Sequence, residues 1–241
     1  EDVSLIRLFY DMGVRLAGFA HFRNNQFADS ATDPDGEHWG GLSPLGMDLL
    51  AEMNRLGIVP DASHSSDRVL DDLLRLSKTP LLLSHSGCRA VYDHPRNIDD
   101  AHLRALAAQG GVIQINSYGG YLRARKPNPE REQALRALSA AYGGGEGPMT
   151  AARHAEFTAK RAEIDRHYPD ADRPDFDDFM KHLLHALKVA GPDHVGIGLD
   201  WDGGGGVVGM EDVADLPKIT AALLAAGYSE EDIGRIWSGN V

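Results

Sequence analysis

The sequence predicts an α/β fold, a (β/α)8 barrel of the TIM type, of which this chain shows about the last five strands. Short apolar runs alternate with segments of helical periodicity, a pattern typical of parallel βαβ units with right-handed crossovers. Polar side chains also follow several different strands, as they do at the mouth of a barrel, whereas an open sheet concentrates its site at one switch point. These observations favour the barrel over a doubly wound sheet.

The composition is that of a folded protein with a sizeable core. The 241 residues are 42% hydrophobic and 25% charged. No run of about 18 apolar residues is present to span a bilayer. The formal net charge of −12 disfavours non-specific binding to nucleic acid or to an anionic membrane surface. Cys88 is the single cysteine, which excludes an intramolecular disulfide, and no motif marks it as a nucleophile.

The first half of the chain alternates helices with three predicted strands. Ser43 and Pro44 supply the cap and the first position of one helix, and Gly57 ends it. The run 80–84 is fully apolar, as in a strand buried on both faces. The predicted elements are, in order, a helix at the N-terminus, a strand at 13–20, a helix at 44–56, a strand at 57–62, a helix at 66–77 and a strand at 80–84.

The second half continues the alternation but contains a segment of different composition. Residues 123–172 are rich in Arg, Glu, Ala and Gly, and we predict a helical insertion in one loop, with 143–148 as a flexible break. Ser229 and Asp232 form a capping-box pattern for the last helix. The remaining predicted elements are a helix at 100–109, a strand at 111–116, a helix at 175–190, a strand at 194–199 and helices at 216–226 and 229–238.

We therefore predict a single barrel domain over residues 1–241 that lacks its N-terminal strands and carries the insertion at 123–172. The chain opens in a helix with no initiator Met or signal-peptide pattern, and it stops directly after a helix-ending Gly-Asn pair. We expect further residues at both ends of the natural protein. Bacterial cytoplasm and periplasm both remain open as its compartment.

Histidine and aspartate side chains stand where predicted strands end, at His21, His64, His85 and Asp200. Adjacent parallel strands lie about 4.8 Å apart, so His64 and His85 can share one metal ion. Asp200 can serve as a ligand or as a general base on a metal-bound water. The structural alternatives are hydrogen-bonded or exposed histidines, an aspartate that caps the glycine-rich loop after it, and a solvated Arg96.

Other polar features of the chain are predicted to lie outside the site. Gly203–Gly206 lacks the spacing of a phosphate-binding loop, and we interpret it as a mobile loop at the barrel mouth. His182 and His185 are predicted to be helix-surface residues. The other histidines left out of the site are His38, His94, His102, His154, His167 and His194.

With these residues in view, the sequence resembles the renal or membrane dipeptidase family, zinc peptidases of the amidohydrolase-like barrel type. The resemblance covers almost the whole chain except the insertion. The segments that carry it are 13–16 leading to His21 with 28–30, 41–46, 52–58 with 61–64, 84–86 followed by 96–97, 193–198 with 200–203, and 227–229.

The resemblance implies a role for each of five residues. His64 and His85 match the histidine pair that binds one ion of a two-zinc centre. His21 matches the histidine that contacts the scissile carbonyl oxygen, and Arg96 matches the arginine that holds the carboxylate at the C-terminus of the substrate. Asp200 matches the acidic residue that moves a proton between water and the leaving amine. The implied reaction is hydrolysis of a dipeptide by a metal-activated water.

The sequence departs from the family pattern at the metal site. The family holds its first zinc with a His-x-Asp pair and bridges both ions with a Glu, and neither motif occurs here. Glu1 lies too close to the first helix to be assigned as that bridge. The threonine that the family places before the substrate-contacting histidine is also replaced, because the sequence here is Phe19-Ala20-His21.

The leading hypothesis is therefore that the chain is the C-terminal portion of a zinc dipeptidase and contains the His pair of one ion. One alternative is a catalytically inactive or truncated dipeptidase-like binding protein, and another is a metal-dependent hydrolase of a different amide. A sugar- or phosphate-binding barrel has only the glycine run in its favour. The expected partner is a dipeptide or similar small amide and not nucleic acid, and a homodimer is left open.

Overall fold

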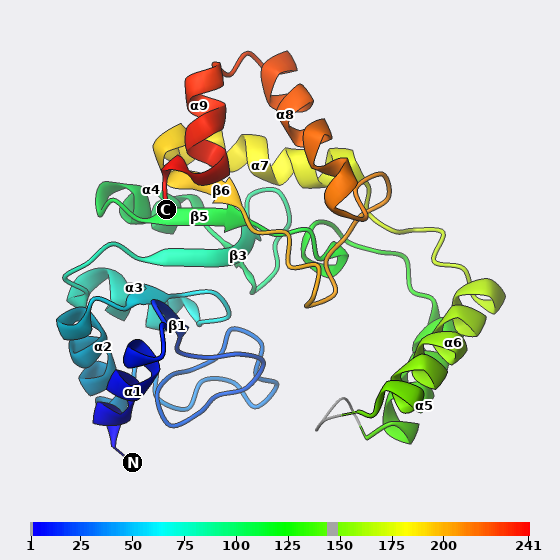
Figure 1. Ribbon diagram of the computed structural model, residues 1–241, viewed down its shortest axis with the longest axis horizontal. Coiled ribbons are helices and arrows are strands. Elements are labelled where there is room, and N and C mark those ends of the chain that lie inside the picture. The colour runs from blue at the N-terminus through cyan, green and yellow to red at the C-terminus, as the bar shows by residue number, and fades with distance from the viewer. Residues whose placement is uncertain (1, 144–148) are drawn as a thin grey trace. The chain divides into compact units, whose positions relative to one another are not determined.

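A computed structural model of the protein describes residues 2–143 and 149–241 (Figure 1). These residues form two compact units. The larger comprises the chain up to Ala124 and from Pro174 to Val241, and the smaller comprises Arg125–Arg173. No helix among the described residues is long and apolar enough to cross a membrane.

The larger unit is built on a parallel sheet with the strand order β1-β2-β3-β5-β6. The prediction of five strands is confirmed for this path, although most strands are shorter than predicted. A further strand, β4, pairs only with β3 and was not predicted, because two residues are too few to give an apolar pattern. The strands are β1 (Leu16–Gly18), β2 (Val59–Asp61), β3 (Leu82–Cys88), β4 (Asn97–Ile98), β5 (Val112–Ile115) and β6 (Val195–Ile197).

Helices follow the strands, and local sequence determines where they begin and end. The Ser43 hydroxyl accepts a hydrogen bond from the backbone of Gly46, and Gly57 ends the same helix with φ at 81°. The predicted capping box of Ser229 and Asp232 is confirmed. The helices of this unit are α1 (Ile6–Asp11), α2 (Pro44–Leu56), α3 (Asp67–Leu76), α4 (Asp100–Ala108), α7 (Phe176–Ala190), α8 (Leu216–Ala225) and α9 (Glu230–Gly234), the last followed by a π turn at Arg235–Gly239.

The core of this unit lies between the sheet and its helices. Leu83, Ile113 and Val195 on adjacent strands are fully buried. Helix α7 contacts β3, β5 and β6, and its Phe179 and Leu183 belong to the same buried cluster as these strand residues. Among the described residues, β1 and β6 each pair with a single strand, so the sheet is an open segment there. Apolar side chains near β1 remain exposed, namely Leu8, Phe9, Met12 and Leu16.

The smaller unit contains two helices that contact each other, α5 (Pro129–Ala141) and α6 (Ala151–His167). Tyr142 packs edge-on against Phe157, with 5.4 Å between ring centroids, and the Arg131 guanidinium donates to the carboxylate of Asp165. Most of the predicted flexible break, residues 144–148, lies outside the described residues. The assignment of 123–172 as an insertion within a single barrel domain stays a prediction.

Gly46 is where helix α2 approaches the loop that leads from β1 to it. A Cβ at this position would lie 2.1 Å from the Phe27 carbonyl oxygen, so a side chain requires a backbone shift. We expect Gly46→Ala to lower the free energy of unfolding by about 1–3 kcal/mol, the usual cost of overpacking. Gly234→Ala in α9 is the matched control, because nothing lies within 4 Å of its added methyl group. Urea denaturation of both variants checks this, and equal stabilities would contradict it.

Candidate metal and substrate site

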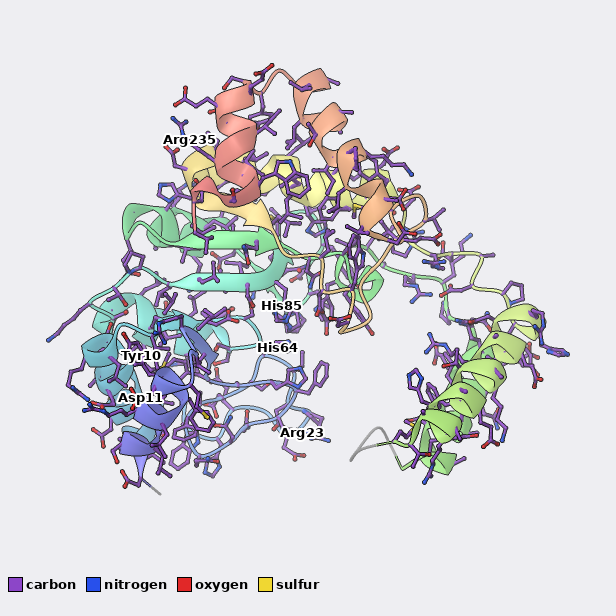
Figure 2. All side chains as sticks on the ribbon, in the orientation of Figure 1. Tyr10, Asp11, Arg23, His64, His85 and Arg235 are labelled. Atoms are coloured by element: carbon purple, nitrogen blue, oxygen red, sulfur yellow. The ribbon has the colours of Figure 1, made fainter. Side chains whose placement is uncertain are left out.

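The ends of β2 and β3 bring two predicted ligands together. His64 follows β2, whereas His85 lies inside β3 rather than after it as predicted, next to an irregularity in the pairing with β5. Their Nε2 atoms are 2.8 Å apart (Figure 2). The ring of His21, from the loop after β1, is 4.3 Å from the ring of His64. The three histidines therefore form a continuous row.

Hydrogen bonds fix the orientation of the His85 ring. The Ser84 hydroxyl donates to the Asp61 carboxylate at 2.5 Å, so it accepts from Nδ1 of His85 at 2.8 Å. The Ser63 hydroxyl also accepts from the backbone N–H of His85 at 3.0 Å. Because the proton is on Nδ1, Nε2 of His85 carries a lone pair, which accepts from Nε2 of His64 at 2.8 Å. A histidine whose other nitrogen donates to a carboxylate-linked group is typical of metal sites.

Both facing imidazoles are neutral at ordinary pH. Burial, followed by the charge of Arg96, lowers the pKa of His64 to about 2. The same two causes lower the pKa of His85, which the carboxylates of Asp200 and Asp61 partly oppose. The Nδ1 atom of His64 is buried and has no hydrogen-bond partner. Two neutral imidazole nitrogens directed at one point fit part of a zinc ligand set. In the described part of the chain, however, no third Cys, His, Asp or Glu joins them to complete such a set.

Arg96 is a buried cation beside the histidine row. Its side chain is among the largest fully buried ones, and its guanidinium donates to the His85 carbonyl at 2.9 Å and to the Ser86 hydroxyl at 3.4 Å. The guanidinium carbon lies 5.3 Å from the centre of the Tyr121 ring. Its Nε has no hydrogen-bond partner, and the carboxylates that act on it among the described residues, Asp61 and Asp200, do so only from a longer distance, without a direct ion pair. A buried cation without a direct ion-pair partner favours an incoming anion.

Asp200 follows β6 in a left-handed backbone conformation, with φ at 58°. Its carbonyl accepts from the backbone of Gly205 at 2.7 Å and of Gly203 at 3.1 Å. A Cβ on Gly203 would lie 2.2 Å from the Asp200 carboxylate. The glycine run is therefore a tight turn around Asp200; its predicted mobility is not tested by this structure.

Backbone strain is concentrated at the predicted site. In the described segments, the non-glycine residues with positive φ are His64, at 69°, and Asp200, at 58°. Each such conformation costs on the order of 1–3 kcal/mol and persists where the surroundings enforce it, often at functional sites. The structure thus brings His21, His64, His85, Arg96 and Asp200 within electrostatic range of one another.

Some residues of the site were not predicted. Asp61, Ser63 and Ser84 orient His85, and Tyr121 covers Arg96. A signal existed for Asp61, because an aspartate that interrupts an apolar strand is unusual. No comparable sequence signal marks Tyr121, which ends a short 3-10 helix (Gly119–Tyr121) after β5.

The prediction that His182 and His185 are helix-surface residues is wrong for His182. His182 is fully buried, because it lies on the same face of α7 as Phe179 and Leu183. His185 is partly buried, and its Nε2 is 2.7 Å from the Asp100 carboxylate.

Cys88 is also buried, and burial raises the pKa of its thiol to about 12. This agrees with the expectation that Cys88 is not a nucleophile.

Comparison with known proteins identifies the class. Residues 1–241 match the family model described as membrane dipeptidase, peptidase family M19. The chain belongs to this family of metallopeptidases, so the resemblance is confirmed, and membership implies a metal cofactor. The sheet is accordingly part of the TIM-type barrel of this family.

Individual relatives are called dipeptidases. An uncharacterized dipeptidase of Schizosaccharomyces pombe is 33% identical over 240 residues, which are 99% of this chain and 47% of that protein. Dipeptidase tcpJ of Claviceps purpurea is 32% identical over 239 residues, 99% of this chain and 45% of that protein. The chain therefore spans about half the length of these curated relatives.

Solved structures show the same likeness. The probable dipeptidase PvdM of Pseudomonas aeruginosa superposes with a TM-score of 0.77 at 32% identity, over 99% of this chain and 64% of that one. A metallo peptidase of Rhodobacter sphaeroides, bound to a phosphinate mimic of the dipeptide L-Ala-D-Ala, gives 0.70 at 28% identity, over 98% of this chain and 56% of that one.

The Ser84 hydroxyl links the Asp61 carboxylate to Nδ1 of His85 through two hydrogen bonds. We expect Ser84→Ala in the natural protein to weaken zinc binding about 10- to 100-fold, as loss of a ligand's hydrogen-bond partner does. Ser77→Ala is the control, because the Ser77 hydroxyl also makes hydrogen bonds but lies outside the site. Competition with a metal chelator measures both affinities, and equal affinities would contradict the assignment.

The burial of His182 makes the free energy of unfolding depend on pH. Burial lowers its pKa in the folded protein below the ordinary value, so the unfolded chain binds a proton first on acidification. Its contribution is therefore constant above about pH 6.5 and is lost progressively below it. We expect His182→Asn to reduce the slope of unfolding free energy between pH 7 and pH 5 by up to about 1.4 kcal/mol per pH unit. Urea denaturation across this range measures the slope, and an unchanged slope would refute the account.

Proposed function

We propose that the protein containing this chain is a zinc-dependent dipeptidase that hydrolyses the amide bond of a dipeptide with a metal-activated water. The observation that carries the proposal is the pair of facing Nε2 atoms on His64 and His85, placed directly beside the buried Arg96. This pairing supports a metal and an anionic group of the substrate next to each other, as hydrolysis of a small peptide requires.

His64 and His85 hold one of the two zinc ions in this proposal. Both are neutral, and the proton on Nδ1 of His85 leaves a lone pair on its Nε2, which a metal ion would take in place of the hydrogen bond from His64. When bound, zinc supplies a Lewis acid and lowers the pKa of a water from about 16 to about 7. The chain contributes two imidazoles to this centre.

Arg96 binds the C-terminal carboxylate of the dipeptide. Its guanidinium is anchored to the carbonyl of His85, which fixes the distance between the carboxylate pocket and the histidine pair. A buried guanidinium can bind a carboxylate through two parallel hydrogen bonds, which orients the substrate as well as attracting it. This geometry favours substrates with one residue between the scissile bond and the carboxylate.

His21 and Asp200 act on the reacting atoms in this proposal. His21 donates a hydrogen bond to the carbonyl oxygen as negative charge develops there. Asp200 takes a proton from the attacking water and delivers it to the amine nitrogen as the carbon–nitrogen bond breaks. The strained backbone of Asp200 and the turn of Gly203 around it hold the carboxylate in one position for both transfers.

A dipeptide panel tests the proposal on the zinc-loaded natural protein. We expect hydrolysis, and we expect His85→Ala to lower kcat/KM by more than about 100-fold because it removes a ligand rather than a ligand's partner. His154→Ala on α6 is the control, because this histidine is exposed. Normal rates in His85→Ala would reject the assignment. Binding of dipeptides without hydrolysis would favour the inactive binding protein, and turnover of other amides alone would favour the related hydrolase.

A further inference from the structure

Two buried side chains hold consecutive peptide groups beside the carboxylate pocket. The Asn97 amide donates to the Tyr121 carbonyl at 2.7 Å. His182 lies 2.8 Å through Nε2 from the carbonyl of the next residue, Leu122. Asn97 and His182 are both fully buried. The carbonyl groups of Tyr121 and Leu122 are therefore each held by a hydrogen bond to a buried side chain.

The hydrogen bonds of His182 determine its tautomer. Its Nδ1 accepts from the backbone N–H of Cys88 at 2.9 Å, so Nδ1 carries no proton. Nε2 must then carry the proton that is donated to the Leu122 carbonyl. Both ring nitrogens are used, and each bond goes to a different segment, one to β3 and the other to the segment after β5.

Gly87 shows how closely these groups are packed under the site. A Cβ on Gly87 would lie 2.4 Å from the side-chain oxygen of Asn97 and 3.0 Å from Nδ1 of His182. Gly87 is two residues after His85 in β3. The network thus starts at the strand of the histidine pair and ends at Tyr121, whose ring lies over the Arg96 guanidinium.

We propose that His182 is a positioning residue of the carboxylate pocket, which holds Tyr121 and through it the guanidinium of Arg96 by donating from Nε2 to the Leu122 carbonyl. The inference rests on the proposed function for the role of Arg96. His182 is too deeply buried to touch substrate, so its effect reaches the reaction only through the pocket that it supports.

Two conservative variants separate the two hydrogen bonds. His182→Gln places an amide N–H near the position of Nε2 and keeps the donor to Leu122. His182→Asn places an oxygen near the position of Nδ1, so it keeps the acceptor for Cys88 and loses the donor to Leu122. His185→Gln on the same helix is the control for the substitution itself, because its amide N–H likewise lies near the position of Nε2, where it faces Asp100 and not the Leu122 carbonyl.

The kinetic test uses the zinc-loaded natural protein with a dipeptide and with the matching dipeptide amide, which lacks the carboxylate. We expect His182→Asn to raise KM for the dipeptide about tenfold, with kcat nearly unchanged, because lost positioning weakens binding of the carboxylate. KM for the amide should stay within about twofold, and His182→Gln and His185→Gln should resemble the wild type.

Amide hydrogen exchange gives a readout that does not depend on activity. The N–H groups of Tyr121 and Leu122 bond to the carbonyls of Tyr118 and Gly119, and they should exchange faster in His182→Asn than in the two Gln variants. Equal exchange in all variants overturns the inference, as does faster exchange with unchanged KM for the dipeptide. A wild-type protein that hydrolyses no dipeptide overturns the proposed function instead, while exchange still reports whether His182 holds this segment.

Discussion

The carboxylate of Asp61 joins the two strands on which the site is built. Strands β2 and β3 share little backbone pairing, with a single register pair at Asp61 and Leu82. The Asp61 carboxylate adds hydrogen bonds from the backbone of Ser63 and from the backbone and hydroxyl of Ser84. His85 takes its ring orientation from this arrangement, and Arg96 is anchored to the His85 carbonyl. The orientation of His85 and the position of Arg96 thus depend on one anionic group.

Several features of the candidate site lower the stability of the folded protein when nothing is bound there. His64 and Asp200 have strained backbones, and among the described residues the buried Arg96 has no direct ion pair with a carboxylate. Each of these features raises the free energy of the folded state. The apolar layer beneath, with Leu83 and Ile113 fully buried, supplies the compensating stability. In the proposed function, a metal ion would bind the facing histidines and an anionic substrate would pair with Arg96, so both would offset part of this cost.

The sequence predicts the sheet well because buried parallel strands are nearly continuous apolar runs, as at Leu81–Leu83 and Val112–Ile115. It places the end of β3 too early, because the apolar run stops at Leu83 while backbone pairing continues through His85 to Cys88. His64 and His85 stand out in the sequence because each follows an apolar run in successive strand–helix units, and the structure brings their Nε2 atoms to a separation of 2.8 Å.

Other parts of the site could not be found from the sequence. His182 is polar on the apolar face of a helix, and its burial becomes reasonable only when its partners, Cys88 and Leu122, are known. These residues are distant in sequence, and no local pattern connects them. Tyr121 could not be found from the sequence either, because its contact with Arg96 depends on how the chain folds in space.

The turn around Asp200 bears on which substitutions the site can accept. Gly203 makes no contact with metal or substrate in the proposed mechanism, yet the volume of its missing side chain is occupied by the Asp200 carboxylate. Any side chain there must displace the carboxylate before it disturbs anything else. Gly203, which has no functional group of its own, therefore leaves the space that the Asp200 carboxylate takes.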